Sequence, residues 1–335
     1  MSNDDRLGQL RDWLAQFDGL EQAEPVPAST DASFRRYFRI GNDETFVAMD
    51  APPPMEDCRP FVDVAGYLEE MGLNAPRVIQ ADLERGFLLL TDLGRDQYLA
   101  FLGAHPSRAD DLYRDALDAL AVMVEKGSPW QRRLPPYNEA LLRFEMSLFH
   151  DWLCERHLGV VFSTAEERSW RDCCDLLVNN ALEQPAVFVH RDYHSRNLMV
   201  TPHNNPGILD FQDAVEGPLT YDLVSLLKDC YIKFPADTIR ERAAYFYSRL
   251  APEFHALVDE RRFIAHFDLM GVQRHLKAAG IFARLLHRDG KAGYLGDVPR
   301  TLSYIVDLAP QYPLLESLVE LIAERVLPSL EASVA

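Results

Sequence analysis

Short apolar runs bounded by turn residues extend from the start of the chain to about residue 93. Runs of this length, rich in β-branched and aromatic residues, are typical of strands. The strands are predicted at 29–40, where two form a hairpin, and at 45–49, 78–79 and 86–90. Apolar residues at helical spacing predict two helices in the same part of the chain, over 6–17 and 56–71. We therefore expect residues 1–93 to form a small lobe built on a five-stranded antiparallel sheet.

The pattern changes after residue 93, because apolar positions then recur with a period near 3.6. That period places apolar side chains along one face of an α-helix. Helices are predicted at 109–126, 137–158, 165–183, 237–249, 253–269, 271–287 and 313–334. The chain is thus predicted to have an α+β fold, in which a larger, mainly helical lobe over residues 94–335 follows the sheet lobe.

One stretch of the helical part follows the strand pattern instead, and its sequence over residues 190–213 is HRDYHSRNLMVTPHNNPGILDFQD. Asp192, Asn197 and Asp210 stand in loops beside its apolar runs. H-R-D-x-x-x-x-N, followed by apolar residues and D-F, is the catalytic-loop signature of kinases. In that signature the first carboxylate accepts the proton of a substrate hydroxyl. The amide and the second carboxylate hold Mg²⁺ on the phosphates of ATP.

The hairpin at 29–40 offers one way to bind nucleotide phosphates. Backbone at Ser33 and the side chains of Arg35, Arg36 and Arg39 could lie over phosphate oxygens. The hairpin contains no glycine-rich repeat. A surface hairpin with solvated arginines is an equally good interpretation of these residues on position alone.

Thr91, Asp92 and Leu93 follow the last predicted strand and are expected to form the hinge between the lobes. A backbone that crosses a cleft would offer the carbonyl of Thr91 and the N–H of Leu93 to the edge of an adenine. The alternative is a plain turn from strand to helix, with Asp92 near the helix N-terminus. Both interpretations can hold together.

The charge balance excludes some classes of partner. The chain has 335 residues with 34 Lys and Arg against 52 Asp and Glu, a formal net charge of −18. Nucleic acids and anionic membranes bind to basic surfaces, so neither is an expected partner. The acidic surface would tolerate a cationic substrate but does not identify one.

Cysteine usage and the apolar runs indicate a protein of the cytoplasm. The five cysteines include no C-x-x-C spacing, which argues against a zinc site or a disulfide framework. The first residues, MSNDDRLGQL, have neither a basic region nor an apolar core of the signal-peptide type. No apolar run reaches the length of a membrane span. Nothing in the sequence indicates an obligate protein partner.

Residues 187–228 resemble the aminoglycoside phosphotransferase and choline kinase superfamily of small-molecule kinases. The resemblance rests on HRDYHSRNLMV and GILDFQDAVEGPLTYDLVSLL. It implies a bilobal protein-kinase-like fold and the use of ATP and Mg²⁺. Within the superfamily, STDASFRRYFR, VAMDAPPP, LLLTDLG and QRHLKAAGIFARL resemble the bacterial anomeric amino sugar kinases. Those enzymes phosphorylate the C1 hydroxyl of N-acetylmuramate or N-acetylglucosamine during peptidoglycan recycling.

The resemblance also implies a role for each matching residue. Asp192 matches the catalytic aspartate, and Asn197 and Asp210 match the Mg²⁺ ligands. His190 matches a histidine that braces the loop, and Asp222 matches an aspartate that supports the loop from the following helix.

Two positions depart from the pattern of this fold. Kinases usually end the third strand with a lysine that contacts the phosphates, and here Asp50 takes its place. The glutamate that pairs with that lysine is not apparent either, since Phe61 falls near its expected position. A carboxylate would repel phosphate, so positive charge must come from elsewhere. Arg35, Arg36 and Arg39 are the nearest candidates, which favours the nucleotide-binding interpretation of the hairpin.

Candidates for contact with the acceptor substrate lie on a later helix and in the catalytic loop. Arg274 and Lys277 are one helical turn apart, so their side chains could point the same way. Such a pair of cations could bind the lactyl carboxylate of N-acetylmuramate. His194, two residues after Asp192, could also touch substrate. The alternatives are a solvated helix face and a loop histidine bonded to the backbone.

Other functions remain open. One is a different small-molecule kinase of the same superfamily, acting on an aminoglycoside, choline or homoserine. Another is a regulatory nucleotide-binding pseudokinase, which the missing lysine would suit. A protein kinase is disfavoured, because the sequence has no G-x-G-x-x-G loop and too few residues between Asp210 and Gly217 for an activation segment.

Overall fold

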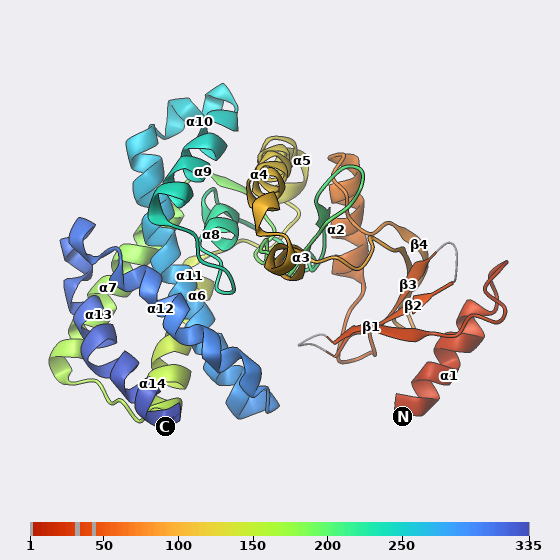
Figure 1. Cartoon of the computed structure of the whole chain (residues 1–335), viewed down its shortest axis with the longest axis horizontal. Helices are drawn as coiled ribbons and strands as arrows, with labels where there is room; N and C mark the ends of the chain where they lie inside the picture. Colours follow the sequence, from red (N-terminus) through yellow and green to blue (C-terminus); the bar gives the residue numbers. More distant parts are fainter. Residues whose placement is uncertain (1–2, 31–33, 42–44, 335) are drawn as a thin grey trace. The chain divides into compact units, whose positions relative to one another are not determined.

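The computed structural model of the protein describes residues 3–30, 34–41 and 45–334. The chain forms two compact units, of which the first contains residues 1–97 together with 198–213. The second contains residues 98–197 together with 214–335. The first unit is built on a sheet and the second is mainly helical, which confirms the predicted α+β class (Figure 1). The lobe boundary at residues 93 and 94 stays a prediction.

A five-stranded antiparallel sheet with the order β1-β2-β3-β5-β4 is the frame of the first unit (Figure 1). The strands are β1 (Val26–Thr30), β2 (Arg36–Ile40), β3 (Phe46–Asp50), β4 (Val78–Asp82) and β5 (Phe87–Thr91). Asp50, the last residue of β3, pairs with Arg36 on β2 and with Phe87 on β5. Asp50 therefore has a neighbouring strand on each side.

Two helices accompany this sheet. Leu10 of α1 (Asn3–Leu14) is fully buried and shares a hydrophobic cluster with Phe38 of β2 and Phe87 of β5. In α2 (Arg59–Glu70) the buried face consists of Phe61, Val64, Ala65 and Leu68. Because apolar residues recur at helical spacing in both helices, each has a face to bury.

A short hairpin from later in the chain also belongs to the first unit, and its strands are β7 (Leu198–Met199) and β8 (Gly207–Ile208). The N–H of Ile208 donates to the carbonyl of Asn74 at 2.7 Å. Phe211, just beyond β8, is fully buried, and its ring centroid lies 4.7 Å from that of Phe61. These contacts attach the segment that carries Asp210 to α2.

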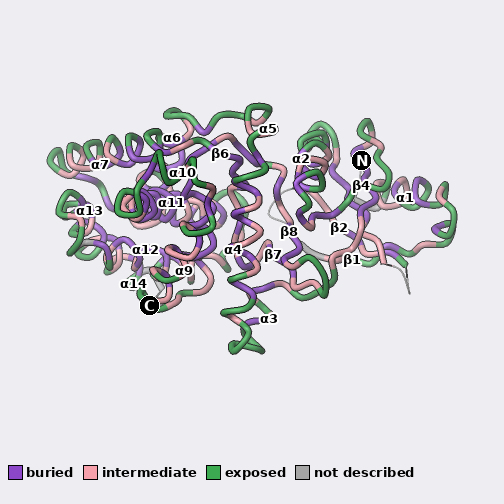
Figure 2. The backbone as a smooth tube through the Cα atoms, turned by 90° about the horizontal axis from the view of Figure 1, so that it is seen from above, coloured by how far each residue is buried: buried purple, intermediate pink, exposed green. Residues whose placement is uncertain are grey.

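Helices make up most of the second unit. They are α3 (Tyr98–Ala104), α4 (Ala109–Lys126), α5 (Ser128–Gln131), α6 (Glu139–Leu148), α7 (Thr164–Leu182), α8 (Tyr221–Leu227), α9 (Ala236–Arg249), α10 (Pro252–Leu257), α11 (Glu260–Asp289), α12 (Val298–Val306), α13 (Glu316–Leu321) and α14 (Leu327–Val334). A π-helical segment, η2 (Phe149–His157), continues α6. Most residues of α11 are buried, and Figure 2 shows α11 in the middle of this unit with other helices around it.

The prediction of two helices at 253–269 and 271–287 is wrong, because α11 runs without a break from Glu260 to Asp289. Gly271 does not end the helix. A Cβ at this position would lie 3.3 Å from the Nζ of Lys228, so the glycine lets that side chain pass close to the helix. Asp259 is the N-cap residue of the helix, and its side chain accepts the N–H of Arg262 at 2.8 Å.

Two short antiparallel strands, β6 (Ala186–Val189) and β9 (Val215–Pro218), carry the predicted catalytic loop in the second unit. Val187, Phe188 and Val189 are buried and fix the end of β6. Residue 190 follows directly, so the loop starts from a rigid point.

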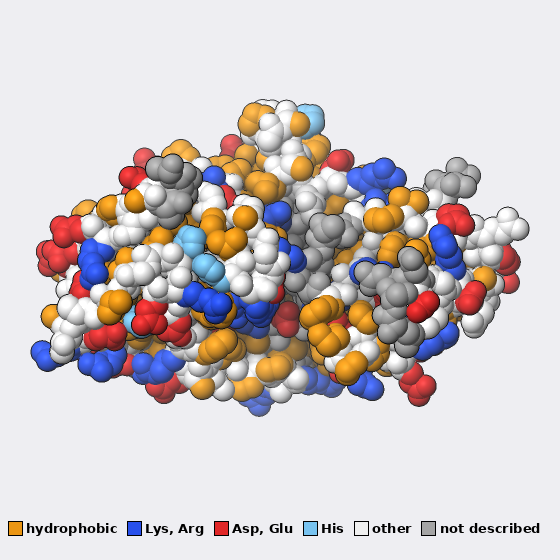
Figure 3. All heavy atoms as spheres, turned by 90° about the horizontal axis from the view of Figure 1, so that it is seen from below, with side chains coloured by type: hydrophobic (Ala, Val, Ile, Leu, Met, Phe, Trp, Pro, Cys, Tyr) orange, Lys and Arg blue, Asp and Glu red, His pale blue; other side chains and the backbone are white. Residues whose placement is uncertain are grey.

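Acidic and basic side chains are interspersed on the face shown in Figure 3. The excess of acidic residues, 52 against 34 basic ones, is thus not gathered into one field on that face. Among the residues that the structure describes, no helix combines the length and the apolar character that a membrane crossing requires.

Candidate active site

The loop of residues 190–197 begins with an unusual backbone turn that Asp222 stabilises. Arg191 has a φ of 78°, a left-handed conformation that is uncommon for residues with a side chain. The two carboxylate oxygens of Asp222, in the first turn of α8, accept the N–H groups of His190 at 2.6 Å and of Arg191 at 2.9 Å. Burial raises the pKa of Asp222 to about 7, although both N–H donors act the other way. Asp222 thus contacts the start of the loop, and its supporting role stays a prediction.

Hydrogen bonds within the loop hold the backbone on both sides of the Asp192 carboxylate. The side-chain amide of Asn197 and the N–H of His194 both donate to the carbonyl of Asp192, each at 3.0 Å. The N–H of Asp192 donates to Nδ1 of His190 at 3.2 Å. Because Nδ2 of Asn197 faces the loop, Oδ1 is the atom that this residue would offer to a metal.

Basic side chains keep Asp192 ionised. Loss of water around this partly exposed carboxylate would by itself raise its pKa. Lys277, His194, Arg274 and Arg191 act in the opposite direction, and the net effect lowers the pKa of Asp192. A lowered pKa leaves the carboxylate able to accept a hydrogen bond from a hydroxyl at neutral pH.

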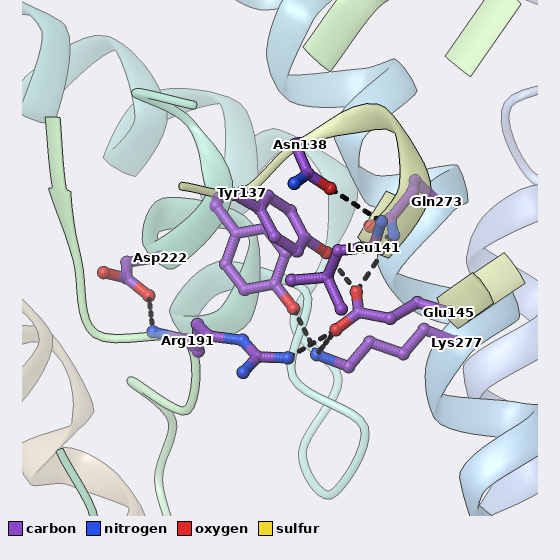
Figure 4. Close-up of polar contacts among 9 residues, drawn as sticks. Tyr137, Asn138, Leu141, Glu145, Arg191, Asp222, Gln273 and Lys277 are labelled. Carbon is purple, nitrogen blue, oxygen red and sulfur yellow. Dashed lines mark hydrogen bonds and ion pairs between the residues drawn. The ribbon is translucent and has the colours of Figure 1, made fainter. Parts of the chain in front are cut away.

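Glu145 of α6 is the centre of a buried polar network in this unit (Figure 4). One of its oxygens accepts Nη2 of Arg191 at 2.5 Å and lies 2.9 Å from Nζ of Lys277. The other oxygen accepts the hydroxyl of Tyr137 and, at 3.3 Å, Nε2 of Gln273. Burial would raise the pKa of Glu145, but Lys277 and Arg191 outweigh it and the pKa is lowered. An ionised Glu145 thus joins α6 and α11 to the turn at Arg191.

The three predicted substrate contacts lie in this unit in different surroundings. Lys277 donates to the hydroxyl of Tyr221 at 2.8 Å, in addition to its ion pair with Glu145. Arg274 is 6% exposed, and its Nη1 lies 3.7 Å from Sγ of Cys230. Nδ1 of His194 is buried and has no hydrogen-bond partner among the described residues. None of the three is a solvated surface residue.

Asp210 belongs to the other unit, where it also has a left-handed backbone, with a φ of 62°. Its Oδ1 accepts Nε2 of Gln212 at 2.8 Å. The adjacent Phe211 is anchored against Phe61. The residue near the expected place of the missing glutamate therefore has a packing role next to Asp210.

Asp50, at the place of the missing lysine, is fully buried and bound by two arginines. Its Oδ1 accepts Nε of Arg6 at 2.9 Å, and its Oδ2 accepts Nε of Arg36 at 3.0 Å. Arg6 comes from α1, while Arg36 is directly opposite Asp50 on β2. Two guanidinium groups and one carboxylate carry a net charge of +1, so this cluster does not present the negative charge that Asp50 alone would.

The other two predicted arginines are paired as well. Nη2 of Arg39 donates to Asp92 at 3.1 Å and to the carbonyl of Gly94 at 2.7 Å. The hydrogen bond to Asp92 raises the pKa of Arg39, and the pair remains charged. Arg35 lies 3.2 Å from Glu56. Each predicted arginine is thus held by a carboxylate of its own unit.

The segment expected to contact adenine is packed from two sides within the first unit. The hydroxyl of Thr91 accepts the N–H of Arg77 at 2.9 Å, at the end of β5. Leu93 is half-buried, and its Cδ1 would be 2.9 Å from a Cβ at position 207, which explains the glycine there. Ser33, the remaining predicted contact, lies outside the described residues.

Sequence patterns missed Arg6 and Glu145, although each leaves a signal. Arg6 stands four residues before the buried Leu10, and Glu145 lies one helical turn from the buried Leu142 and Leu148 on α6. A charged residue on the apolar stripe of a helix indicates a buried partner, because an unpaired buried charge is costly. Neither partner is close in sequence, so the signal names no contact.

Residues 24–263 match the model of the phosphotransferase enzyme family. The chain belongs to this family. It is 48% identical to the N-acetylmuramate/N-acetylglucosamine kinase of Pseudomonas aeruginosa, over 96% of this chain and 98% of the relative. The relative of the same name from Neisseria meningitidis is 37% identical, over 93% of this chain and 95% of its own length. Within the phosphotransferase enzyme family, the chain therefore groups with the amino sugar kinases.

Solved structures of the phosphotransferase enzyme fold agree with the architecture. The ethanolamine kinase of Plasmodium vivax superposes with a TM-score of 0.63 at 10% identity, over 93% of this chain and 89% of that one. The choline kinase LicA of Streptococcus pneumoniae has a TM-score of 0.60 at 10% identity, over 90% of this chain and 99% of that one. At such low identity these structures support the fold alone.

Proposed function

We propose that this protein transfers the γ-phosphoryl group of ATP to the anomeric C1 hydroxyl of N-acetylmuramate, N-acetylglucosamine or both. The observation that carries the proposal is the carboxylate of Asp192, held ionised on a loop with a fixed backbone. Relatives that are 37% to 48% identical over nearly their whole length are named as kinases of these two sugars. The chain is thus proposed to share both the reaction and its acceptors.

Asp192 would orient the sugar hydroxyl and accept its proton as the phosphoryl group leaves ATP. Phosphoryl transfer passes through a loose transition state, so catalysis depends on positioning and on charge neutralisation. An anomeric hydroxyl is more acidic than the other hydroxyls of a sugar. Asp192 therefore need not be a strong base, and its lowered pKa keeps it ionised to accept the hydrogen bond of this hydroxyl.

Asn197 and Asp210 would hold the metal ion. An amide oxygen and a carboxylate are the hard donors that Mg²⁺ prefers. The amide of Asn197 is turned so that Nδ2 binds the loop backbone, which suits Oδ1 to a cation. Bound Mg²⁺ would neutralise charge on the nucleotide phosphates. The N–H of Asn197 donates to the carbonyl of His194 at 2.9 Å, and Asp210 has a left-handed backbone.

The nucleotide would be bound by the first unit. Arg36, half of the pair that encloses Asp50, is the best candidate for the missing phosphate-binding lysine, because its side chain is 26% exposed. Arg35 and Arg39 would add charge beside it. Thr91 and Leu93 would present backbone groups to the adenine, and Ser33 would contact a phosphate.

The proposal is tested by the position of the phosphate in the product. The purified protein is incubated with Mg-ATP and either sugar, and the product is analysed by phosphorus NMR. A C1 phosphate supports the proposal, whereas a C6 phosphate would assign a different reaction. Phosphorylation of choline, homoserine or an aminoglycoside in preference to both sugars would point to another kinase of the family. Bound ATP without turnover on any of them would indicate a pseudokinase.

A role in peptidoglycan recycling would follow from these substrates. A cytoplasmic location, and a protein without a nucleic acid, membrane or obligate protein partner, remain predictions from the sequence.

A further inference from the structure

Two cations of α11 that act on Asp192 are in unequal situations. Lys277 has an anionic partner, Glu145, at 2.9 Å. Arg274 is 94% buried, since its exposed fraction is 6%, yet no carboxylate of the described residues lies within 4.0 Å of it. Its Nη1 donates to the thiol of Cys230 at 3.7 Å, and its Nε has no partner in the described part of the chain.

A buried guanidinium without a counter-ion is unfavourable unless something else supplies the missing interaction. Two buried carboxylates of this unit, Asp229 and Asp222, already accept hydrogen bonds from other groups. Asp229 accepts the N–H and hydroxyl of Ser195, and its other oxygen accepts the N–H of Tyr231 at 2.9 Å. Asp222 accepts the two N–H groups at the start of the loop. Arg274 is therefore left with donors that an anion from outside the protein could satisfy.

The position of Arg274 limits which anion this is. Arg274 contacts Cys230, and the preceding residue, Asp229, accepts the N–H of Ser195 at 3.0 Å, so an anion bound at Arg274 lies beside the loop that carries Asp192. His194, whose Nδ1 has no partner in the part of the chain that the structure describes, also acts on Asp192. The two proposed acceptors differ in one charged group, the lactyl carboxylate of N-acetylmuramate, which is attached to the same ring as the C1 hydroxyl.

We propose that Arg274 is the receptor for the carboxylate of N-acetylmuramate, which makes it a specificity-determining residue. The inference rests on the proposed function and deepens it. Lys277 has a different task, because its charge is used by Glu145, which also holds Arg191. Lys277 is thus a positioning residue for the catalytic loop and serves both sugars alike. Arg274 and Lys277 are one helical turn apart in the sequence, but their different contacts assign them different roles.

The test compares kcat/KM for N-acetylmuramate and N-acetylglucosamine in Arg274→Gln, Arg274→Lys and Lys277→Met. A hydrogen bond to a charged group contributes a factor of about 10 to 100 in affinity. Arg274→Gln should therefore lower kcat/KM for N-acetylmuramate, relative to kcat/KM for N-acetylglucosamine, by about that factor. Arg274→Lys should retain part of the preference. Lys277→Met should lower turnover with both sugars and leave the ratio near its original value. Arg261→Gln, at an exposed position of the same helix, is the matched control.

A second measurement needs no variant and stays decisive if Arg274→Gln folds poorly. The methylamide of N-acetylmuramate lacks the negative charge, so the unaltered protein should use it at least about tenfold less efficiently than the acid. Arg274→Gln should no longer distinguish acid from amide. Equal use of acid and amide by the unaltered protein, or an equal loss with both sugars in Arg274→Gln, would overturn the inference. If the unaltered protein still phosphorylates N-acetylglucosamine at C1 when the inference about Arg274 fails, the proposed function survives. If the unaltered protein phosphorylates neither sugar, both proposals fail.

Discussion

The carboxylate of Asp222 accepts the N–H of Arg191 at 2.9 Å and so stabilises a residue with a φ of 78°. This hydrogen bond fixes the backbone of Arg191, the residue directly before Asp192. It also couples the loop to a titratable group, because burial raises the pKa of Asp222 to about 7.

Turnover should therefore rise as the pH increases through about 7, because the ionised form of Asp222 accepts both N–H groups. The pKa of Asp192 is lowered, so Asp192 does not produce this limb of the profile. In Asp222→Asn one of the two N–H groups faces an amide donor, and turnover should fall by about 10², with the inflection near pH 7 lost. The check is a profile of kcat against pH for both proteins. An unchanged inflection in the variant would assign that limb to another group.

The raised pKa of Asp222 affects stability in the opposite direction, because it lowers the free energy of unfolding as the pH rises. The pKa of Asp222 lies at about 7 in the folded protein, against an ordinary value of 3.8. Between these two values the folded protein holds a proton that the unfolded chain has released. The contribution of Asp222 to the free energy of unfolding should thus decrease as the pH rises through that window and stay constant above it. Urea titrations across the window, compared between the unaltered protein and Asp222→Asn, measure this contribution.

Asp192→Asn should bind Mg-ATP with little change while kcat falls by about 10² to 10⁴, the usual value of a general base. Nucleotide binding is measured by calorimetry without sugar, and turnover by coupled ADP release. The variant keeps the backbone contacts of residue 192, so its fold should be retained. Near-normal turnover would remove Asp192 from the proposed mechanism.

The cluster around Asp50 predicts two separable effects. Arg36→Ala should raise the KM for ATP, because its guanidinium is proposed to face the phosphates. Asp50→Asn should lower the free energy of unfolding by about 3 kcal/mol, because Arg6 and Arg36 would lose a fully buried counter-ion. Chemical denaturation measures the second effect. Arg11→Gln is the control, since its ion pair with Glu24 is exposed.

If Arg35, Arg36 and Arg39 can each be replaced by alanine without a change in ATP kinetics, the pairs are only structural. The three arginines would then serve to neutralise their partner carboxylates and not to bind nucleotide.

Gly280 is predicted to be irreplaceable in α11. A Cβ there would lie 2.2 Å from the carbonyl carbon of Leu148, at the junction of α6 and η2. Backbone atoms cannot move aside as a side-chain end can, so Gly280→Ala should cost about 3 kcal/mol or more. Gly66→Ala is the matched control, because Gly66 of α2 has open space and alanine should stabilise that helix by about 1 kcal/mol. Thermal denaturation of both variants measures the difference.

The parts of the site that sequence could predict are local ones. Asp192, Asn197 and Asp210 stand at fixed spacings within one stretch, and the strands beside them are recognisable as apolar runs. The sheet lobe and the helical part were predictable for the same reason, since periodicity is a local property. Such spacing shows that these residue types belong to one loop, so it can be recognised without knowing the fold.

What sequence could not provide were partners from distant segments. Arg6 and Asp50 are 44 positions apart, and Glu145 and Lys277 come from different helices. Charge pairs of this kind depend on how elements pack, which no window of the sequence contains. Gly271 shows the same limit, because a glycine that could end a helix instead gives room to Lys228 within an unbroken one. Packing overrode the local preference there.

The replacement of a lysine by Asp50 changes how this protein responds to chemical labels. Reagents that acylate the strand lysine of kinases need a nucleophilic amine, and β3 ends in a carboxylate instead. The neighbouring Arg6 and Arg36 are guanidinium groups, which stay protonated and do not react in this way. A nucleotide-based acylating probe applied to a mixture of proteins should pass over this position, while lysine-bearing kinases in the same mixture are labelled.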